Sequence, residues 1–202
     1  SKPKQKTMII GIDYGAKMAG TTVIACLHEQ NQVTLHACSK NQDADQFILD
    51  FIKTYDDVWL AYIDAPLSLP IAYKRLNGNN DYFYRKADRI TGAMSPMFLG
   101  GLTARAIQLK EKMQKAGVKL VETYPSKLAE VLLLKNEGYK KDKEFILQLC
   151  SLLKEKSDFV FDENQVKTWH HFDALLSLYS AKRFEMQAAM VFGNPEEGTI
   201  TV

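Results

Sequence analysis

The sequence predicts an α/β protein whose mixed β-sheet is covered by helices on both faces. Over the first third of the chain, short apolar runs and helical periodicity alternate in the order strand, strand, strand, helix, strand. Residues 58–64 are apolar up to their final acid, which is typical of a strand buried on both faces. Because such a strand has no face toward water, helices must cover the sheet on both sides.

The strands are expected at residues 8–13, 21–27, 33–38, 58–64 and 118–122. A glycine turn joins the first strand to the second as a hairpin, and the polar residues 29–32 join the second to the third. A helix begins at Asp43, a residue type that caps helix N-termini, and places Phe47, Ile48, Phe51 and Ile52 on its apolar face.

Further helices are expected at residues 102–116, 126–135, 143–156 and about 169–190, the second of them capped by Ser126. On the last helix, an apolar stripe is expected beside a narrow polar face that carries His170, Asp173 and Ser177. Residues 71–101 are rich in glycine, asparagine and aromatic residues. We interpret them as an irregular insertion with one short helix around 82–90. The tail 198–202 alternates like a short edge strand.

Composition indicates one domain over residues 8–202, preceded by a basic and disordered arm at 1–7. The chain has 202 residues, 46% of them hydrophobic and 25% charged, and a net charge of +2. No apolar run approaches the roughly 18 residues that cross a bilayer, so no membrane partner is expected. Three cysteines without metal-ligand spacing predict core thiols and a cytoplasmic location.

Three of the expected strands end in a carboxylate: Asp13, Asp64 and Glu122. The carboxyl ends of parallel strands meet at one edge of a sheet, where α/β proteins build their sites. Asp173, near the start of the last helix, is a fourth candidate, and converging acids favour Mg²⁺ or Mn²⁺. Alternatively, Asp13 accepts backbone hydrogen bonds from the following turn, and Asp173 is a cap or a first-turn acid stabilised by the helix dipole.

Several other side chains are candidates for the same site. His170 lies one turn before Asp173 and is a candidate metal ligand or proton shuttle. Candidate contacts to substrate phosphates are Arg85, Arg89, Arg105 and Lys17. The alternative for the first two is ion pairing with Asp88 on one helix face. The aromatic and methionine residues of the insertion stack on bases, bind a partner or form packed core.

The motifs resemble those of a known family. They are Ile-Gly-Ile-Asp-Tyr-Gly-Ala-Lys at the first strand, Ile-Asp-Ala-Pro-Leu-Ser-Leu-Pro from 63, Arg-Lys-Ala-Asp-Arg from 85, Val-Glu-Thr-Tyr-Pro from 121 and Phe-Asp-Ala-Leu from 172. With the closing Glu-Gly-Thr-Ile, they resemble a family of predicted ribonuclease H-like nucleases. That family is classified as a domain of unknown function and is related to the RuvC and YqgF resolvase group.

The resemblance implies a ribonuclease H-like fold with strand order 3-2-1-4-5 and an antiparallel second strand. It also implies that Asp13, Asp64 and Asp173 bind metal, with Glu122 as a fourth acid. The chain departs from the family at the start of the last helix, where His170, His171 and Phe172 replace a second acid that often accompanies the first.

The leading functional hypothesis is a nuclease that uses Mg²⁺ or Mn²⁺ to hydrolyse phosphodiester bonds in nucleic acid. One alternative is a non-catalytic module that binds nucleic acid or protein on the same fold. Another is an actin-like phosphotransferase, since an Asp-x-Gly hairpin also binds phosphate. That class clamps ATP between two such lobes, and a single hairpin in 202 residues supplies one lobe.

Overall fold

The computed structural model describes residues 5–75, 78 and 81–202, so most of the expected N-terminal arm lies outside the described residues. The main sheet has five strands in the order β3-β2-β1-β4-β5. They are β1 (Met8–Asp13), β2 (Val23–Leu27), β3 (Val33–Ala37), β4 (Val58–Ile63) and β5 (Lys119–Glu122). β2 is antiparallel to β1 and β3, whereas β4 is parallel to β1 and β5. The predicted α/β class, mixed sheet and strand order are confirmed.

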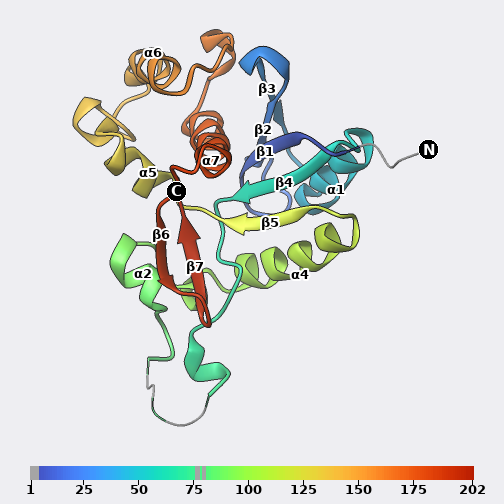
Figure 1. The fold of residues 1–202 in the computed structure, drawn as a ribbon, viewed down its shortest axis with the longest axis vertical. Helices are drawn as coiled ribbons and strands as arrows, with labels where there is room; N and C mark the ends of the chain where they lie inside the picture. Colours follow the sequence, from blue (N-terminus) through green and yellow to red (C-terminus); the bar gives the residue numbers. More distant parts are fainter. Residues whose placement is uncertain (1–4, 76–77, 79–80) are drawn as a thin grey trace.

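Helices cover both faces of the main sheet (Figure 1). The helices α1 (Ala44–Thr54) and α4 (Gly101–Lys115) cover one face, and α5 (Pro125–Val131), α6 (Phe145–Ser157) and α7 (Trp169–Glu185) cover the other. Side chains alternate along β1, so Ile9 packs into the core beneath α7 while Ile10 and Ile12 pack into the core beneath α1 and α4. The sheet is therefore buried on both faces, as the apolar strands predict.

α7 lies in the centre of its layer and is buried on all sides from Phe172 to Ala181. It contacts β1, β2 and β4 on one side and α5 and α6 on the other. Asp173 and Ser177, expected on a narrow polar face of this helix, are as buried as their apolar neighbours. Gly11 allows this close approach: a Cβ at this position would lie 2.1 Å from the backbone nitrogen of Leu178.

Two helices end earlier than predicted, each beside a residue in the left-handed conformation. α5 ends before Leu133, whose φ is 62°, and a short 3-10 helix (Leu134–Glu137) follows instead of a continuation to residue 135. α7 ends at Glu185, since Gln187 has a φ of 59°. The predicted Ser126 cap is also wrong, because α5 begins one residue earlier at Pro125, a residue favoured in the first helical turn.

The segment expected as an insertion contains a 3-10 helix (Ile71–Tyr73), α2 (Lys86–Thr91) and α3 (Pro96–Leu99). The end of the chain packs against it as a hairpin of β6 (Val191–Asn194) and β7 (Gly198–Thr201). The tail thus pairs in a separate two-stranded sheet, not along the edge of the main one. Buried Glu197 accepts hydrogen bonds from the backbone nitrogens of Ile71 (2.8 Å) and Lys86 (2.7 Å), which ties the hairpin to the segment.

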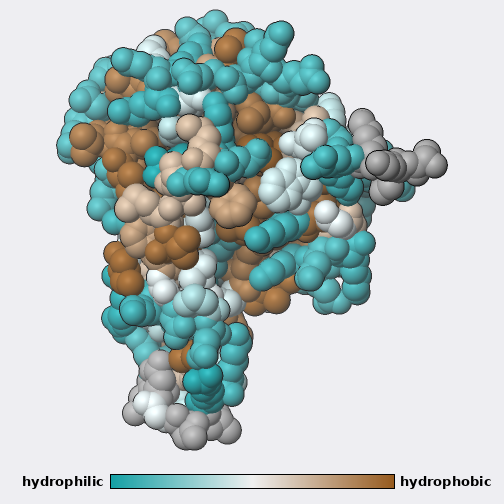
Figure 2. All heavy atoms as spheres, in the orientation of Figure 1, coloured by the Kyte–Doolittle hydropathy of each residue, from teal (hydrophilic) through white to brown (hydrophobic). Residues whose placement is uncertain are grey.

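Apolar side chains reach the surface over α2 and β6, where Ile90 and Val191 are exposed (Figure 2). Cys26, Cys38 and Cys150 are buried free thiols, as their number and spacing predict. Within the described ranges, none of the helices combines the length and apolar character needed to cross a bilayer.

Candidate metal centre

Asp13 and Asp64 emerge side by side at the carboxyl edge of the main sheet. β1 and β4 are parallel, with Ile12 paired to Ile63, so the residue that follows on each strand leaves the sheet at the same level. The backbone nitrogen of Asp64 donates a 3.0 Å hydrogen bond to the carbonyl of Ile12, which continues the pairing by one residue. Because each of these two neighbouring strands is followed or ended by an acid, the two carboxylates lie next to each other.

Asp173 reaches the same point from α7. Thr168 caps this helix by accepting a hydrogen bond from the backbone nitrogen of His171, so Asp173 lies in the second turn and is not the cap. One carboxylate oxygen from each of Asp13, Asp64 and Asp173 lies within 4.8 Å of the other two. Three elements distant in sequence thus bring three acids together, and we call this group the acidic cluster.

The three acids differ in their partners. Oδ2 of Asp13 lies 2.8 Å from Nδ1 of His170, while the turn amide of Gly15 donates instead to Oγ1 of Thr22 at 3.0 Å. Asp13 therefore does not accept the hydrogen bond from this turn amide, contrary to the alternative expected from the sequence. The Asp64 carboxylate, by contrast, has no hydrogen-bond donor in the part of the chain that the structure describes.

Asp173 is held by two consecutive residues that the sequence did not single out for the site. The hydroxyl of Tyr139 donates a 2.6 Å hydrogen bond to its Oδ1, and Nζ of Lys140 lies 2.8 Å from its Oδ2. Lys140 adopts a left-handed backbone conformation with a φ of 57°. Its sequence neighbourhood is a run of lysines typical of a solvated helix face, and no local pattern indicates that Tyr139, the residue before it, contacts a side chain 34 residues away.

The pKa values of all three acids in the acidic cluster are raised, chiefly by burial. Burial raises the pKa of Asp13, although the hydrogen bond and charge of His170 oppose the rise. Burial and the neighbouring charges of Asp13 and Asp173 raise the pKa of Asp64 well above its usual value. Burial also raises the pKa of Asp173 to about 6, against the opposing charge of Lys140. A cation placed among these carboxylates would favour their ionised forms.

Glu122 lies at the end of β5, as expected, but it faces a different partner. Its two carboxylate oxygens accept hydrogen bonds of 2.7 and 2.6 Å from the guanidinium of Arg85, and the backbone nitrogen of Leu67 donates a third of 2.9 Å. Arg85 is fully buried and also pairs with Asp88 at 2.7 Å. Burial by itself lowers the pKa of Arg85, but the hydrogen bonds to both carboxylates raise it, so the guanidinium stays charged.

The structure therefore does not bring Glu122 into the acidic cluster, nor does it leave Arg85 open to a substrate phosphate. The bidentate contact between Arg85 and Glu122 is buried, so we interpret it as a fixed part of the fold. A buried guanidinium needs such carboxylate partners, and Arg85 has two of them. His170 likewise contacts Asp13 and is not among the three grouped ligands in the described residues.

The remaining cationic candidates differ in accessibility. Arg105 pairs with Asp45 through two 3.0 Å contacts and donates to the carbonyl of Gly15 at 3.1 Å, so it anchors the turn after β1. Arg89 is 62% exposed and pairs with Asp81 while it stacks on Tyr84. The alternative expectation was that Arg85 and Arg89 pair with Asp88. It is confirmed for Arg85, whereas Arg89 pairs with Asp81.

Lys17 is 54% exposed in the turn that follows Asp13. Its ammonium group lies 3.5 Å from Asp43. Of the four predicted phosphate contacts, Lys17 and Arg89 are therefore the exposed ones, and Arg85 and Arg105 are committed to internal pairs.

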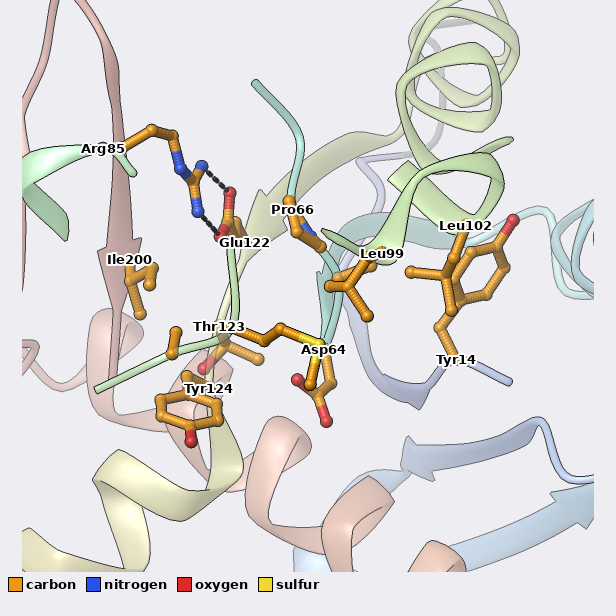
Figure 3. A pocket seen from close by; sticks show the side chains of 13 residues that line it. Tyr14, Asp64, Pro66, Arg85, Leu99, Leu102, Glu122, Thr123, Tyr124 and Ile200 are labelled. Atoms are coloured by element: carbon orange, nitrogen blue, oxygen red, sulfur yellow. Dashed lines mark hydrogen bonds and ion pairs between the residues drawn. The ribbon is translucent and has the colours of Figure 1, made fainter. Parts of the chain in front are cut away.

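A cavity of about 230 Å³ opens beside Asp64. Figure 3 shows the Asp64 carboxylate turned away from the Arg85–Glu122 pair at the other end of this cavity. Apolar side chains dominate the wall, and Tyr14, Thr123 and Tyr124 add polar atoms. The acidic cluster thus borders a largely apolar space that is built from the insertion and from the ends of β4 and β5.

No protein-family model matches this chain, and a search of curated proteins finds no significant relative. The fold and geometry define the class: an α/β protein with a buried acidic site at the carboxyl edge of a mixed sheet. Its activity has to be argued from that site.

Proposed function

We propose that the protein is a nuclease that hydrolyses phosphodiester bonds with Mg²⁺ or Mn²⁺ on a ribonuclease H-like fold. The acidic cluster is the observation that supports this proposal most strongly. One carboxylate oxygen from each of Asp13, Asp64 and Asp173 lies within 4.8 Å of the other two. The strand order and the antiparallel β2 support the proposed fold, because the resemblance implied both.

The donor set fits a hard divalent cation. All three groups are carboxylates, the ligands that Mg²⁺ and Mn²⁺ prefer, and the cluster contains no thiol. Among the described residues Asp64 has no hydrogen-bond donor, and burial and like charge raise its pKa, so an ion there would relieve the repulsion. When bound, such ions activate water and stabilise the leaving oxygen in phosphodiester cleavage.

Side chains around the acidic cluster orient one of its ligands and offer a group for proton exchange. Tyr139 and Lys140 fix both oxygens of Asp173, so this ligand is oriented before any ion arrives. His170 is half exposed and holds Asp13 through Nδ1, which leaves its other ring nitrogen to exchange a proton with substrate or water. The hydrogen bond to Asp13 raises the pKa of His170, so its imidazolium form persists at higher pH than usual.

The test is cleavage of a panel of single-stranded, duplex, hybrid and branched nucleic acids in Mg²⁺ or Mn²⁺. The wild type is expected to cleave at least one substrate, and Asp13→Asn and Asp64→Asn to lose at least ~100-fold in rate. Asp50→Asn is the matched control, because Asp50 is an exposed acid on α1 that contacts Gln46. Cleavage that survives Asp64→Asn would contradict the proposal.

The same variants separate the alternatives. A protein that binds Mn²⁺ by calorimetry but cleaves no substrate would be the non-catalytic module. One that binds ATP and transfers its phosphate would be the phosphotransferase. If the protein neither binds Mn²⁺ nor cleaves any substrate, the acidic cluster is not a metal centre and the proposal is contradicted.

A further inference from the structure

The cavity beside Asp64 combines apolar walls with a buried hydroxyl that has no partner among the described residues. Leu99, Leu102 and Met94 supply apolar surface, and the rings of Tyr14 and Tyr124 line its sides. Thr123 also lines the cavity and is 2% exposed, and its hydroxyl has no hydrogen-bond partner in the described part of the chain. A buried hydroxyl without a partner is costly, so a ligand that supplies one is favoured.

A second apolar surface lies next to this cavity and faces the solvent. Phe83, Met94 and Phe98 are 55%, 59% and 61% exposed, respectively, and we call these three side chains the aromatic shelf. The rings of Phe83 and Phe98 are tilted by 35° with centroids 5.7 Å apart, and Tyr84 meets Phe98 edge-on at 5.8 Å. These exposed rings adjoin one another and are not scattered singly, which is a feature of binding surfaces.

The aromatic shelf is held by hydrogen bonds beneath it. Buried Ser95 caps α3 by accepting from the backbone nitrogen of Met97 at 3.1 Å, and its hydroxyl donates to the carbonyl of Phe83. Thr103 donates a 2.7 Å hydrogen bond to the carbonyl of Pro96. The backbone on both sides of the exposed rings is therefore fixed, and binding there costs little ordering entropy.

The cavity and a groove beside the aromatic shelf share part of their walls, and we call the two together the path. Met94 and Tyr124 line the cavity beside Asp64 and also a groove that extends to Phe98 and Arg89. Arg89 stacks on Tyr84, with its guanidinium carbon 4.5 Å from the ring centroid, and remains exposed. A ligand on this path meets, in order, carboxylates, an apolar cavity, exposed rings and a cation.

We propose that this path binds an unpaired nucleic-acid strand, with one base in the cavity and the next on the aromatic shelf. This inference rests on the proposed function and names its substrate class. Bases stack on exposed aromatic side chains only where their faces are free, which excludes a continuous duplex. Arg89, exposed beside the rings, fits the phosphate of a single strand.

The test measures binding separately from cleavage. Fluorescent single-stranded DNA and RNA oligonucleotides, and the same sequences annealed into duplex, are titrated with protein in Ca²⁺, and anisotropy gives each Kd. Single strands are expected to bind at least ~10-fold more tightly than duplex. Phe98→Ala is expected to weaken single-strand binding by about 10-fold, whereas Phe98→Tyr retains a stacking ring and most of the affinity.

Leu147→Ala is the matched control, because Leu147 is 55% exposed on the distant α6. Phe83→Ala is the second variant, and a thermal melt of each variant verifies folding. Equal binding of duplex and single strands, or an unchanged Kd in both Phe98→Ala and Phe83→Ala, would overturn the proposal. So would a change in oligomeric mass alone, which would make the aromatic shelf a protein contact.

The two proposals fail in different ways. Cleavage that requires Asp64 but shows no effect of Phe98→Ala on binding would contradict the path and leave the nuclease standing. Single-strand binding that depends on Phe98, without cleavage of any substrate, would support the path and contradict the nuclease.

Discussion

The hydroxyl of Tyr139 donates a 2.6 Å hydrogen bond to Oδ1 of Asp173, and the next residue, Lys140, holds Oδ2 at 2.8 Å. Burial and the charge of Asp173 raise the pKa of Tyr139, so its hydroxyl stays protonated and acts as a donor. A carboxylate fixed at both oxygens cannot rotate away from Asp13 and Asp64. The acidic cluster is therefore oriented by groups outside it.

Tyr139→Phe is expected to weaken Mn²⁺ binding by about 10- to 100-fold, the usual effect of losing a group that orients a metal ligand. The ring packs against Trp169 and Phe172, and Phe preserves those contacts. Isothermal calorimetry with Mn²⁺ measures the change. Tyr179→Phe is the control, since the Tyr179 hydroxyl donates to the carbonyl of Lys156, away from the cluster. Equal losses in both variants would assign the effect to general destabilisation.

Arg85→Met is expected to lower the free energy of unfolding by about 3–5 kcal/mol, because it leaves Glu122 and Asp88 buried without their cation. Arg75→Met removes an exposed pair with Glu196 and is expected to cost at most about 1 kcal/mol. Urea denaturation followed by circular dichroism measures both. If Arg85→Met is as stable as Arg75→Met, the buried pair is not a fixed part of the fold.

Gly11→Ala is expected to lower stability by about 1–3 kcal/mol or more, because the added Cβ meets the backbone of α7 at Leu178. It should also weaken Mn²⁺ binding, since α7 carries Asp173. Gly101→Ala is the control: it adds a methyl group in open space at the start of α4. Thermal denaturation and calorimetry distinguish the two, and a Gly11→Ala protein with wild-type stability would contradict the close packing.

The metal-free protein is expected to lose stability as the pH rises through the pKa of Asp173. Burial raises this pKa from 3.8 to about 6, so the folded state binds the proton more tightly than the unfolded state does. The contribution is complete below pH 3.8 and disappears as the pH rises past about 6. Asp173→Asn is expected to flatten this part of the profile of melting temperature against pH. An unchanged profile in that variant would contradict the assignment.

Mn²⁺ affinity is expected to change in the opposite direction. Metal ions require ionised carboxylates, so affinity should fall as the pH drops below about 6 and protons compete for Asp173 and Asp64. Calorimetric titrations on both sides of that pH measure the effect. Affinity that is independent of pH would place the ion elsewhere.

Local patterns were sufficient to predict the main sheet and to identify all three clustered acids as candidates. Each of β1 and β4 is an apolar run that ends beside an acid, and parallel pairing necessarily brings Asp13 and Asp64 together. Asp173 required more, because its position depends on how α7 packs. Its place near the start of the helix made it a candidate and the resemblance implied a metal ligand, but neither indicated that the surrounding layers bury it.

The pairing of charges could not be predicted from local sequence. Glu122 ends a strand as Asp13 does, but Arg85 lies 37 residues away and takes both of its oxygens. Tyr139 and Lys140 reach Asp173 because Leu133 and Lys140 adopt left-handed conformations that redirect the chain after α5. Neither residue type signals such a conformation in a sequence, since glycine and asparagine are the usual markers.

Crystals soaked in Mn²⁺ test the central claim most directly. The account predicts an anomalous difference peak about 2.2 Å from carboxylate oxygens of both Asp13 and Asp64, with Asp173 completing the site. In Asp64→Asn crystals the same peak should be weak or absent, and in Asp50→Asn crystals it should be unchanged. Wild-type crystals with no peak at these residues, or with their carboxylates pointing apart, would contradict it.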